Sequence, residues 1–194
     1  MGVPTRVVVY AETPSLARDA AAGAFARIAE LEQVMSDYRP DSEAMLLCAQ
    51  TPGVPHPISR DLQDILAVSQ HLTEQTGGAF DATIGPATAL WRTVRTTHQL
   101  PSDSDLATAR ALVGSRLLTF NPDARTATLA RPGMRLDFGG IGKGYAAQAA
   151  VDWLRDRGHP RCLVALAGDI AAGDPPPRAR GWVVLLPVPE GGGN

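Results

Sequence analysis

Residues 136–146 read LDFGGIGKGYA, and four of these residues are glycines that fall within six positions. Ordered glycine costs about 0.5–1 kcal/mol relative to alanine in regular structure, so a cluster of four needs a physical reason. A β-rich run precedes the glycines and a helical pattern follows them, which predicts a turn that leads into a helix N-terminus. Such a turn exposes backbone N–H and C=O groups and favours a ligand that carries phosphate.

Three familiar glycine motifs do not match this stretch. A Walker loop needs a glycine where Asp137 stands and a Ser or Thr where Gly144 stands, and a dinucleotide fingerprint needs glycine at Tyr145. The letters DFG occur without the other kinase motifs. From the residues alone, Lys143 is a counter-charge for phosphate and the loop carbonyls are free for Mg²⁺, but a turn that serves packing alone stays open.

Composition limits the classes of function. The chain has 194 residues, of which 44% are hydrophobic and 20% charged, and its net charge is −2. These values indicate one globular domain without the basic field that nucleic acid requires. No apolar run has the roughly 20 residues needed to span a bilayer, and no export signal is visible at the N-terminus.

Hydrophobic periodicity predicts helices and strands in blocks. We expect a strand in residues 5–12, a helix from Thr13 to about Ser36, and a polar turn over residues 36–43. A proline-rich loop then leads to a second helix, which starts at Ser59 and has Leu62, Ile65, Leu66 and Leu72 as its buried stripe. Residues 79–92, AFDATIGPATALWR, lack a clear period and are predicted to be a structured loop.

The C-terminal half shows more strands. A helix is predicted near residues 105–113, strands at 117–120, 126–129 and 134–137, and a helix at 144–157. RCLVALA and WVVLLPV (161–167 and 182–188) are predicted strands, separated by a turn, AGDIAAGDPPP. This order predicts an α+β fold with mainly antiparallel strands.

Four segments together resemble the ApbE family of FAD:protein FMN transferases. The glycine stretch lies within MRLDFGGIGKGYAAQAA (134–150), which resembles the family's glycine loop. MSDYRPDSEAMLL (35–47), TGGAFDATIGPATALW (76–91) and CLVALAGDIAAGD (162–174) are similar to its other motifs, in the same order. The resemblance implies a two-layer domain of antiparallel strands and packed helices, with residues 1–194 forming a single domain that is incomplete at its C-terminus and covers about two-thirds of the family domain.

The resemblance implies a reaction on FAD. Members of the family move FMN from FAD to a threonine hydroxyl of an acceptor protein, release AMP and require Mg²⁺. They usually work outside the cytoplasm. Two alternatives stay open for this chain: a flavin-binding protein without turnover, and a hydrolase that splits FAD to FMN and AMP.

The resemblance also assigns residues to the flavin nucleotide. Tyr38 would pack on it, Asp137 would bond to it from the strand end, and Lys143 would sit beside Asp137. The carbonyl of Gly140 would bind Mg²⁺, with Gly142 as the alternative. The remaining residues that would contact the nucleotide are Met1, Ala79, Phe80 and Asp81.

The residues by themselves permit structural roles for the same side chains. Tyr38 is equally consistent with an ordinary half-buried turn tyrosine, and Asp81 with a carboxylate that stabilises a Gly/Pro-rich loop. Asp137 and Lys143 could form a local surface ion pair of little energetic value.

The chain departs from the family pattern in four places and in length. Gln148, Ala165, Ala167 and Cys48 replace the usual residues of its motifs. Family members continue past residue 194 with a histidine segment and with the Asp and Thr that complete the Mg²⁺ site, so we expect a fragment or a shortened gene. The predicted strand at 182–188 would then leave an apolar edge, which predicts self-association.

Overall fold

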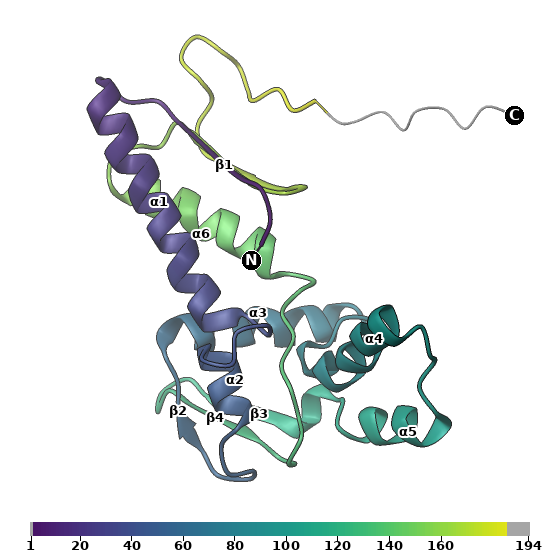
Figure 1. Ribbon diagram of the computed structural model, residues 1–194. Coiled ribbons are helices and arrows are strands. Elements are labelled where there is room, and N and C mark those ends of the chain that lie inside the picture. Colours follow the sequence, from purple (N-terminus) through teal and green to yellow (C-terminus); the bar gives the residue numbers. More distant parts are fainter. Residues whose placement is uncertain (1, 186–194) are drawn as a thin grey trace, which may run out of the picture.

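Two three-stranded sheets and six α-helices make up residues 2–185, which are the residues that the computed structural model describes (Figure 1). All strand pairs are antiparallel, so the predicted α+β class is confirmed. The elements, in chain order, are β1 (Thr5–Val9), α1 (Pro14–Met35), α2 (Glu43–Cys48), β2 (His56–Pro57), α3 (Arg60–Gln75), η1 (Ala82–Ile84), α4 (Gly85–Thr97), α5 (Asp103–Ala111), η2 (Ser115–Leu117), β3 (Leu118–Asn121), β4 (Thr126–Leu129), α6 (Gly142–Asp156), β5 (Cys162–Leu166) and β6 (Asp169–Ala172).

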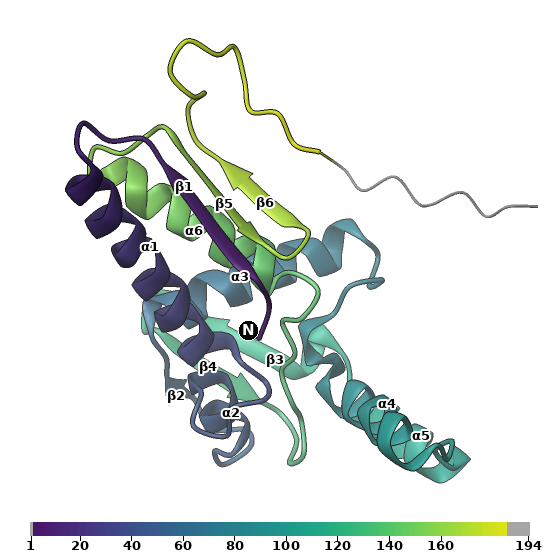
Figure 2. The same cartoon turned by 45° about the horizontal axis from the view of Figure 1, so that its top comes forward.

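The first sheet joins the two ends of the described chain. Its order is β1–β5–β6, and the register of β1 on β5 runs from Thr5 opposite Leu166 to Val9 opposite Cys162. Helices α1 and α6 pack against each other and cover one face of this sheet (Figure 2). Because β1 and β5 are separated by most of the chain, this sheet depends on contacts between residues distant in sequence.

Helix α1 forms as its sequence predicts. The Thr13 side chain accepts a hydrogen bond from the N–H of Leu16 at 3.3 Å, and Pro14 occupies the first turn. One stripe of the helix is buried, and its members are Ala20, Ala24, Ile28, Leu31 and Met35. Leu16, which the periodicity assigned to this stripe, is exposed because it lies in the first turn.

The second sheet, in the order β2–β4–β3, lies beside α2 and α3 (Figure 1). Ser59 caps α3 by accepting a hydrogen bond from Leu62 N at 3.1 Å. The Glu43 carboxylate in turn accepts bonds from the N–H and the hydroxyl of Ser59, at 2.5 and 2.6 Å. This contact ties the start of α2 to the start of α3.

The prediction of a structured loop at residues 79–92 is wrong, because most of these residues are helical. Asp81 caps the short helix η1, and α4 follows directly from Gly85. The Gly85-Pro86 pair suggested a break, but proline is well tolerated in the first turn of a helix, where its missing N–H is not needed. Helix α4 packs on α5 at the side of the second sheet (Figure 2).

Four further expectations need correction. The segment 134–137 is not a strand, since Leu136 N donates to the Cys48 sulfur and Asp137 N to the Ala82 carbonyl, at 3.3 and 2.8 Å. The turn after β5 contains β6, and the predicted proline-rich loop contains the short β2. Helix α2, which was not predicted, follows the predicted turn of residues 36–43. Residues 182–185 do not form a strand, and the rest of that predicted strand lies outside the described residues.

One buried cluster of apolar side chains runs through both sheets and their helices. It includes Leu31 of α1, Leu66 of α3, Leu129 of β4 and Val164 of β5. The single-domain assignment of residues 1–194 stays a prediction. Over residues 2–185, none of the helices has the length and apolar character that crossing a membrane requires.

Candidate functional site

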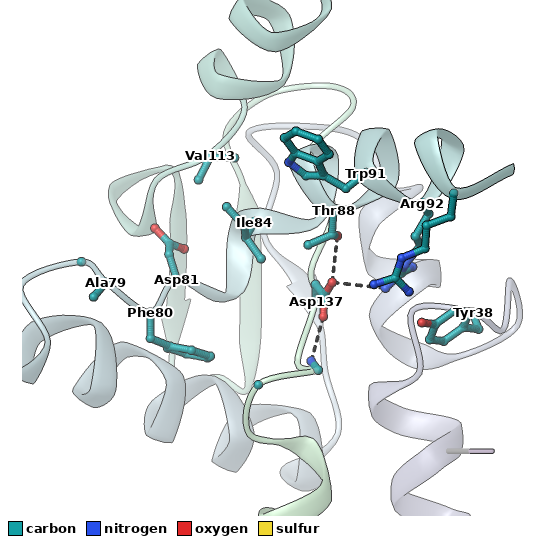
Figure 3. A pocket seen from close by; sticks show the side chains of 14 residues that line it. Tyr38, Ala79, Phe80, Asp81, Ile84, Thr88, Trp91, Arg92, Val113 and Asp137 are labelled. Atoms are coloured by element: carbon teal, nitrogen blue, oxygen red, sulfur yellow. Dashed lines mark hydrogen bonds and ion pairs between the residues drawn. The ribbon is translucent and has the colours of Figure 1, made fainter. Parts of the chain in front are cut away.

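A cleft of about 520 Å³ opens between α4, the η1 region and the glycine loop (Figure 3). Its volume falls within the roughly 300–1,000 Å³ typical of small-molecule sites. Side chains and backbone from three motifs meet there, although they are far apart in sequence. The lining residues are Tyr38, Gly78, Ala79, Phe80, Asp81, Ile84, Thr88, Trp91, Arg92, Arg95, Val113, Asp137, Gly139 and Gly140.

Asp137 is the more buried of the two acidic residues that line the cleft. Its side chain is 8% exposed. Oδ1 accepts a hydrogen bond from the N–H of Gly139 at 2.7 Å, and Oδ2 accepts one from the Thr88 hydroxyl at 2.8 Å (Figure 3). An Arg92 nitrogen lies 3.3 Å from the same Oδ2. The carboxylate therefore links the glycine loop to α4.

Arg92 joins three parts of the site. Its Nη2 forms an ion pair with Asp37 as well as with Asp137, and its guanidinium carbon lies 4.2 Å from the centre of the Tyr38 ring (Figure 3). Burial lowers the pKa of Arg92, but the hydrogen bond and charge of Asp37, with smaller contributions from Tyr38 and Asp137, raise it above its ordinary value overall. Arg92 therefore stays charged at any physiological pH.

Asp81 has a structural role. Its Oδ1 accepts bonds from the N–H and hydroxyl of Thr83 at 2.8 and 2.7 Å, and its Oδ2 accepts one from Ser115 N at 2.8 Å. These contacts fix the start of η1 and join it to the segment before β3. The turn-stabilising alternative is therefore observed, while the predicted contact with the nucleotide stays a prediction; Asp81 does line the cleft.

Two of the four clustered glycines lie where a side chain would be crowded by its neighbours. A Cβ on Gly139 would lie 2.9 Å from Asp137 Oδ1, and one on Gly140 would lie 3.2 Å from a ring carbon of Phe80. A Cβ added at Gly142 or Gly144 would meet no neighbouring residue closer than 3.8 Å. None of the four has a positive φ, so close packing of the loop, rather than backbone conformation, explains the first pair.

Lys143 forms its ion pair with Asp169 and not with Asp137, and its predicted place beside the nucleotide stays a prediction. Its Nζ lies 2.7 Å from Asp169 Oδ2, at the turn before β6. It faces a neighbouring cavity of about 210 Å³, which shares Tyr38 and Gly139 with the cleft. The local Asp137–Lys143 ion pair is thus replaced by a pair with Asp169. Met1 lies outside the described residues.

The sequence interpretation missed the wall that α4 contributes to the cleft. Thr88, Trp91, Arg92 and Arg95 recur at helical spacing and all line it. A helical reading of residues 85–97 would have placed them on one face. Arg95 differs from Arg92, because it makes no ion pair with any residue between 2 and 185.

The donor set does not fit a complete Mg²⁺ site. Within residues 2–185, no group of three His, Cys, Asp or Glu side chains could hold a metal ion. Gly140 is at the cleft, but Mg²⁺ needs near-octahedral oxygen coordination, which one carbonyl does not provide. Both oxygens of Asp137 are already engaged.

Comparison with known proteins identifies the family. The ApbE family model matches residues 1–193. The chain is 27% identical over 170 residues to an FAD:protein FMN transferase of Klebsiella pneumoniae, covering 88% of this chain and 52% of the relative. It is 30% identical over 178 residues to one of Treponema pallidum, with coverages of 89% and 49%. The chain belongs to the ApbE family and spans about half the length of these relatives.

Solved structures share the fold. A mutant of the flavin transferase ApbE from Vibrio cholerae superimposes with a TM-score of 0.80 at 24% identity, covering 89% of this chain and 59% of that one. The apo flavinyl transferase ApbE from Pseudomonas stutzeri gives a TM-score of 0.74 at 24% identity, with coverages of 88% and 58%. The predicted ApbE-like fold is therefore confirmed.

Proposed function

We propose that this chain is the nucleotide-binding part of an FAD:protein FMN transferase. The observation that carries the proposal is the cleft, where residues 38, 78–81 and 137–140 converge from three family-like motifs. Relatives named FAD:protein FMN transferase support the same reading. The substrate is FAD, and the acceptor is a flavoprotein subunit with a target threonine.

The reaction exchanges one phosphorus–oxygen bond for another. The threonine oxygen bonds to the phosphorus of the FMN moiety, the pyrophosphate bond of FAD breaks, and AMP leaves while the hydroxyl proton passes to solvent. The role of this chain is to hold FAD in place for that displacement. Arg95, which makes no ion pair within residues 2–185, supplies positive charge at the cleft, and the Gly139–Gly140 backbone lines it where the pyrophosphate would lie.

Mg²⁺ stays a prediction that rests on the family resemblance. Because the described donor atoms do not complete a cation site, no step of the proposed reaction is assigned to Mg²⁺. An extracytoplasmic location is proposed on the same ground. Fractionation of the source cells, with an antibody against this chain, tests that location.

Transfer of flavin is the direct test. The chain is incubated with FAD, Mg²⁺ and an acceptor protein, and the acceptor is then examined for covalent flavin fluorescence and an added FMN mass. Covalent flavin with stoichiometric AMP supports the transferase. Free FMN and AMP without acceptor would instead indicate the hydrolase, and bound FAD without AMP release would indicate a binding protein.

Asp137→Ala tests the site assignment. We expect FAD binding to fall by at least about tenfold, because the loop loses its bond to Gly139 N and its tie to α4. Asp123→Ala, at an exposed turn, is the matched control and should bind FAD like the wild type. Flavin fluorescence titration measures both. Undiminished binding by Asp137→Ala would contradict the assignment.

A further inference from the structure

The strongest unassigned feature of the cleft is the arginine of α4 that contacts three of its components. We propose that Arg92 is a positioning residue that stacks on one face of the Tyr38 ring. The opposite face of that ring is then available to stack on a planar heteroaromatic ring of the nucleotide. This inference rests on the proposed function. It adds a role to a residue that lines the cleft and contacts both Tyr38 and Asp137.

The contacts of Arg92 come from three segments, which two further hydrogen bonds also join: Thr88 to Asp137, and Arg135 to the Asp37 carbonyl. Asp37 and Tyr38 follow the end of α1, Arg92 lies in the middle of α4, and Asp137 precedes the glycine loop. A single nitrogen, Nη2, serves both carboxylates. The guanidinium thus fixes the positions of the α1–α2 connection and the glycine loop relative to α4.

The positive charge of Arg92 neutralises two nearby carboxylates, so its contacts contribute more than packing. The side chains of Asp37 and Asp137 are only 10% and 8% exposed, so each has little water to solvate its charge. Without the shared cation, two poorly solvated carboxylates would face each other across a short gap. The connection that carries Asp37 and Tyr38 would then move relative to α4, and the Tyr38 ring would lose its fixed position.

The Tyr38 ring has one free face. Arg92 covers the other face at 4.2 Å, yet Tyr38 as a whole is 76% exposed. An exposed turn tyrosine ordinarily samples several rotamers, and stacking with the guanidinium, worth about 0.5–1 kcal/mol at an exposed site, favours one orientation of this ring. A pre-oriented aromatic face at the mouth of a cleft suits a planar ring, because less side-chain entropy is lost when the ligand binds. The isoalloxazine and the adenine of FAD are both planar heteroaromatic rings of this kind.

A double-mutant cycle tests the proposal. FAD binding by flavin fluorescence is compared for the wild type, Arg92→Met, Tyr38→Leu and the double variant. We expect Arg92→Met to weaken binding about tenfold when Tyr38 is present, and no more than about twofold in the Tyr38→Leu background. Arg92→Lys should restore part of the loss, because it keeps the charge but not the planar stack.

Controls separate this role from general stability. Arg18→Met, on the exposed side of α1, should bind FAD like the wild type. In the absence of any ligand, hydrogen–deuterium exchange of Arg92→Met should increase at residues 37–41 and 137–141 together and stay unchanged in α3. Titrations with FMN and with AMP distinguish the isoalloxazine from the adenine as the ring that stacks on Tyr38. Only the ligand whose ring stacks there should show a non-additive effect of the Arg92 and Tyr38 substitutions.

The outcomes are distinct. If wild-type chain does not bind FAD, the proposed function fails, and the ring-stacking role fails with it. If the wild type binds but the losses from Arg92→Met and Tyr38→Leu simply add, the positioning role fails and the proposed function stands. Unchanged exchange at residues 37–41 and 137–141 overturns the positioning role whatever the FAD result.

Discussion

Several glycines near the cleft are explained by the atoms that a side chain at the same position would contact. At Gly139 and Gly140 a Cβ would meet Asp137 and Phe80, which are both cleft residues. Gly85, at the start of α4, has ordinary helical backbone angles, but its Cβ would lie 2.6 Å from the Cβ and carbonyl oxygen of Arg135. These glycines let backbone segments approach closely around the cleft.

Gly85→Ala is therefore expected to destabilise the fold and to disturb the site. The added methyl group must push α4 away from residue 135, and overpacking of this kind costs about 1–3 kcal/mol. Chemical denaturation measures the loss, and FAD titration measures the effect on the cleft. Gly181→Ala, where nothing lies within 4 Å, is the control. Equal stability of the two variants would contradict the steric account.

The two thiols differ in burial, since Cys162 is buried and Cys48 is half-buried. Burial raises the pKa of Cys48 and of Cys162 above the ordinary value of 9.0, and Cys162 is fully buried. A raised pKa in the folded state means that the unfolded thiol ionises first as pH rises. The contribution to stability is then fully present below about pH 9 and lost as pH rises through the folded pKa.

We expect native protein at about pH 8 to react with iodoacetamide far more slowly than protein unfolded in urea. The free energy of unfolding should also fall above about pH 9, and fall less in a variant with alanine at both cysteines. Peptide mass spectrometry and denaturation curves measure the two effects. Equal labelling of native and unfolded protein would show that the thiols are accessible.

At the scale of elements, α2 depends on one buried serine. The Ser42 hydroxyl donates to the Ser36 carbonyl at 2.5 Å and accepts from Met45 N at 3.2 Å, and the residue is fully buried. It therefore caps α2 and also closes the turn that carries Asp37 and Tyr38. Without this hydroxyl, a carbonyl and an N–H would lose their partner where water has little access.

Ser42→Ala is expected to cost about 1–3 kcal/mol of stability. Ser102→Ala is the matched comparison, because Ser102 caps α5 in the same way but is exposed, so water can replace its bonds. We expect the second variant to lose clearly less. Thermal and urea denaturation of both variants test this order, and a larger loss at Ser102 would reverse the argument.

Sequence periodicity predicted α1, α3 and α6 because each has a continuous buried stripe. It did not predict α4, of which only Gly85 is buried, because the helix presents its side chains to a cleft and to α5 rather than to the core. The segment 134–137 has strand-like composition, yet its N–H groups bond to Ala82 and Cys48. The local pattern of apolar residues predicts well which residues are buried, but it predicts poorly which groups their backbone N–H and C=O will bond to.

At the scale of the molecule, the chain exposes apolar side chains near its described end. Val183 and Leu185 are 87% and 90% exposed, and Trp182 lies against Tyr10 beside the first sheet. The self-association predicted from a strand edge now rests on these side chains, since residues 182–185 are not a strand. Exposed apolar groups of this kind favour association between molecules.

We expect the average mass of the chain in solution to rise with concentration. A double variant with Val183→Lys and Leu185→Lys should reduce this association without changing the thermal transition, since neither residue belongs to the core. Sedimentation velocity and calorimetry are the measurements. A monodisperse wild-type monomer that melts cooperatively would contradict the prediction.

The α+β class, the main helices and the family could be predicted from local sequence, because buried periodicity, cap residues and short motifs are local properties of a chain. Which motif residues act together could be learned only from the folded structure. It paired Lys143 with Asp169, used Asp81 to fix a turn, and brought Arg92 between Asp37 and Asp137. Each of these contacts joins positions that are distant in sequence, and their geometry depends on how the whole core packs, which no local pattern records.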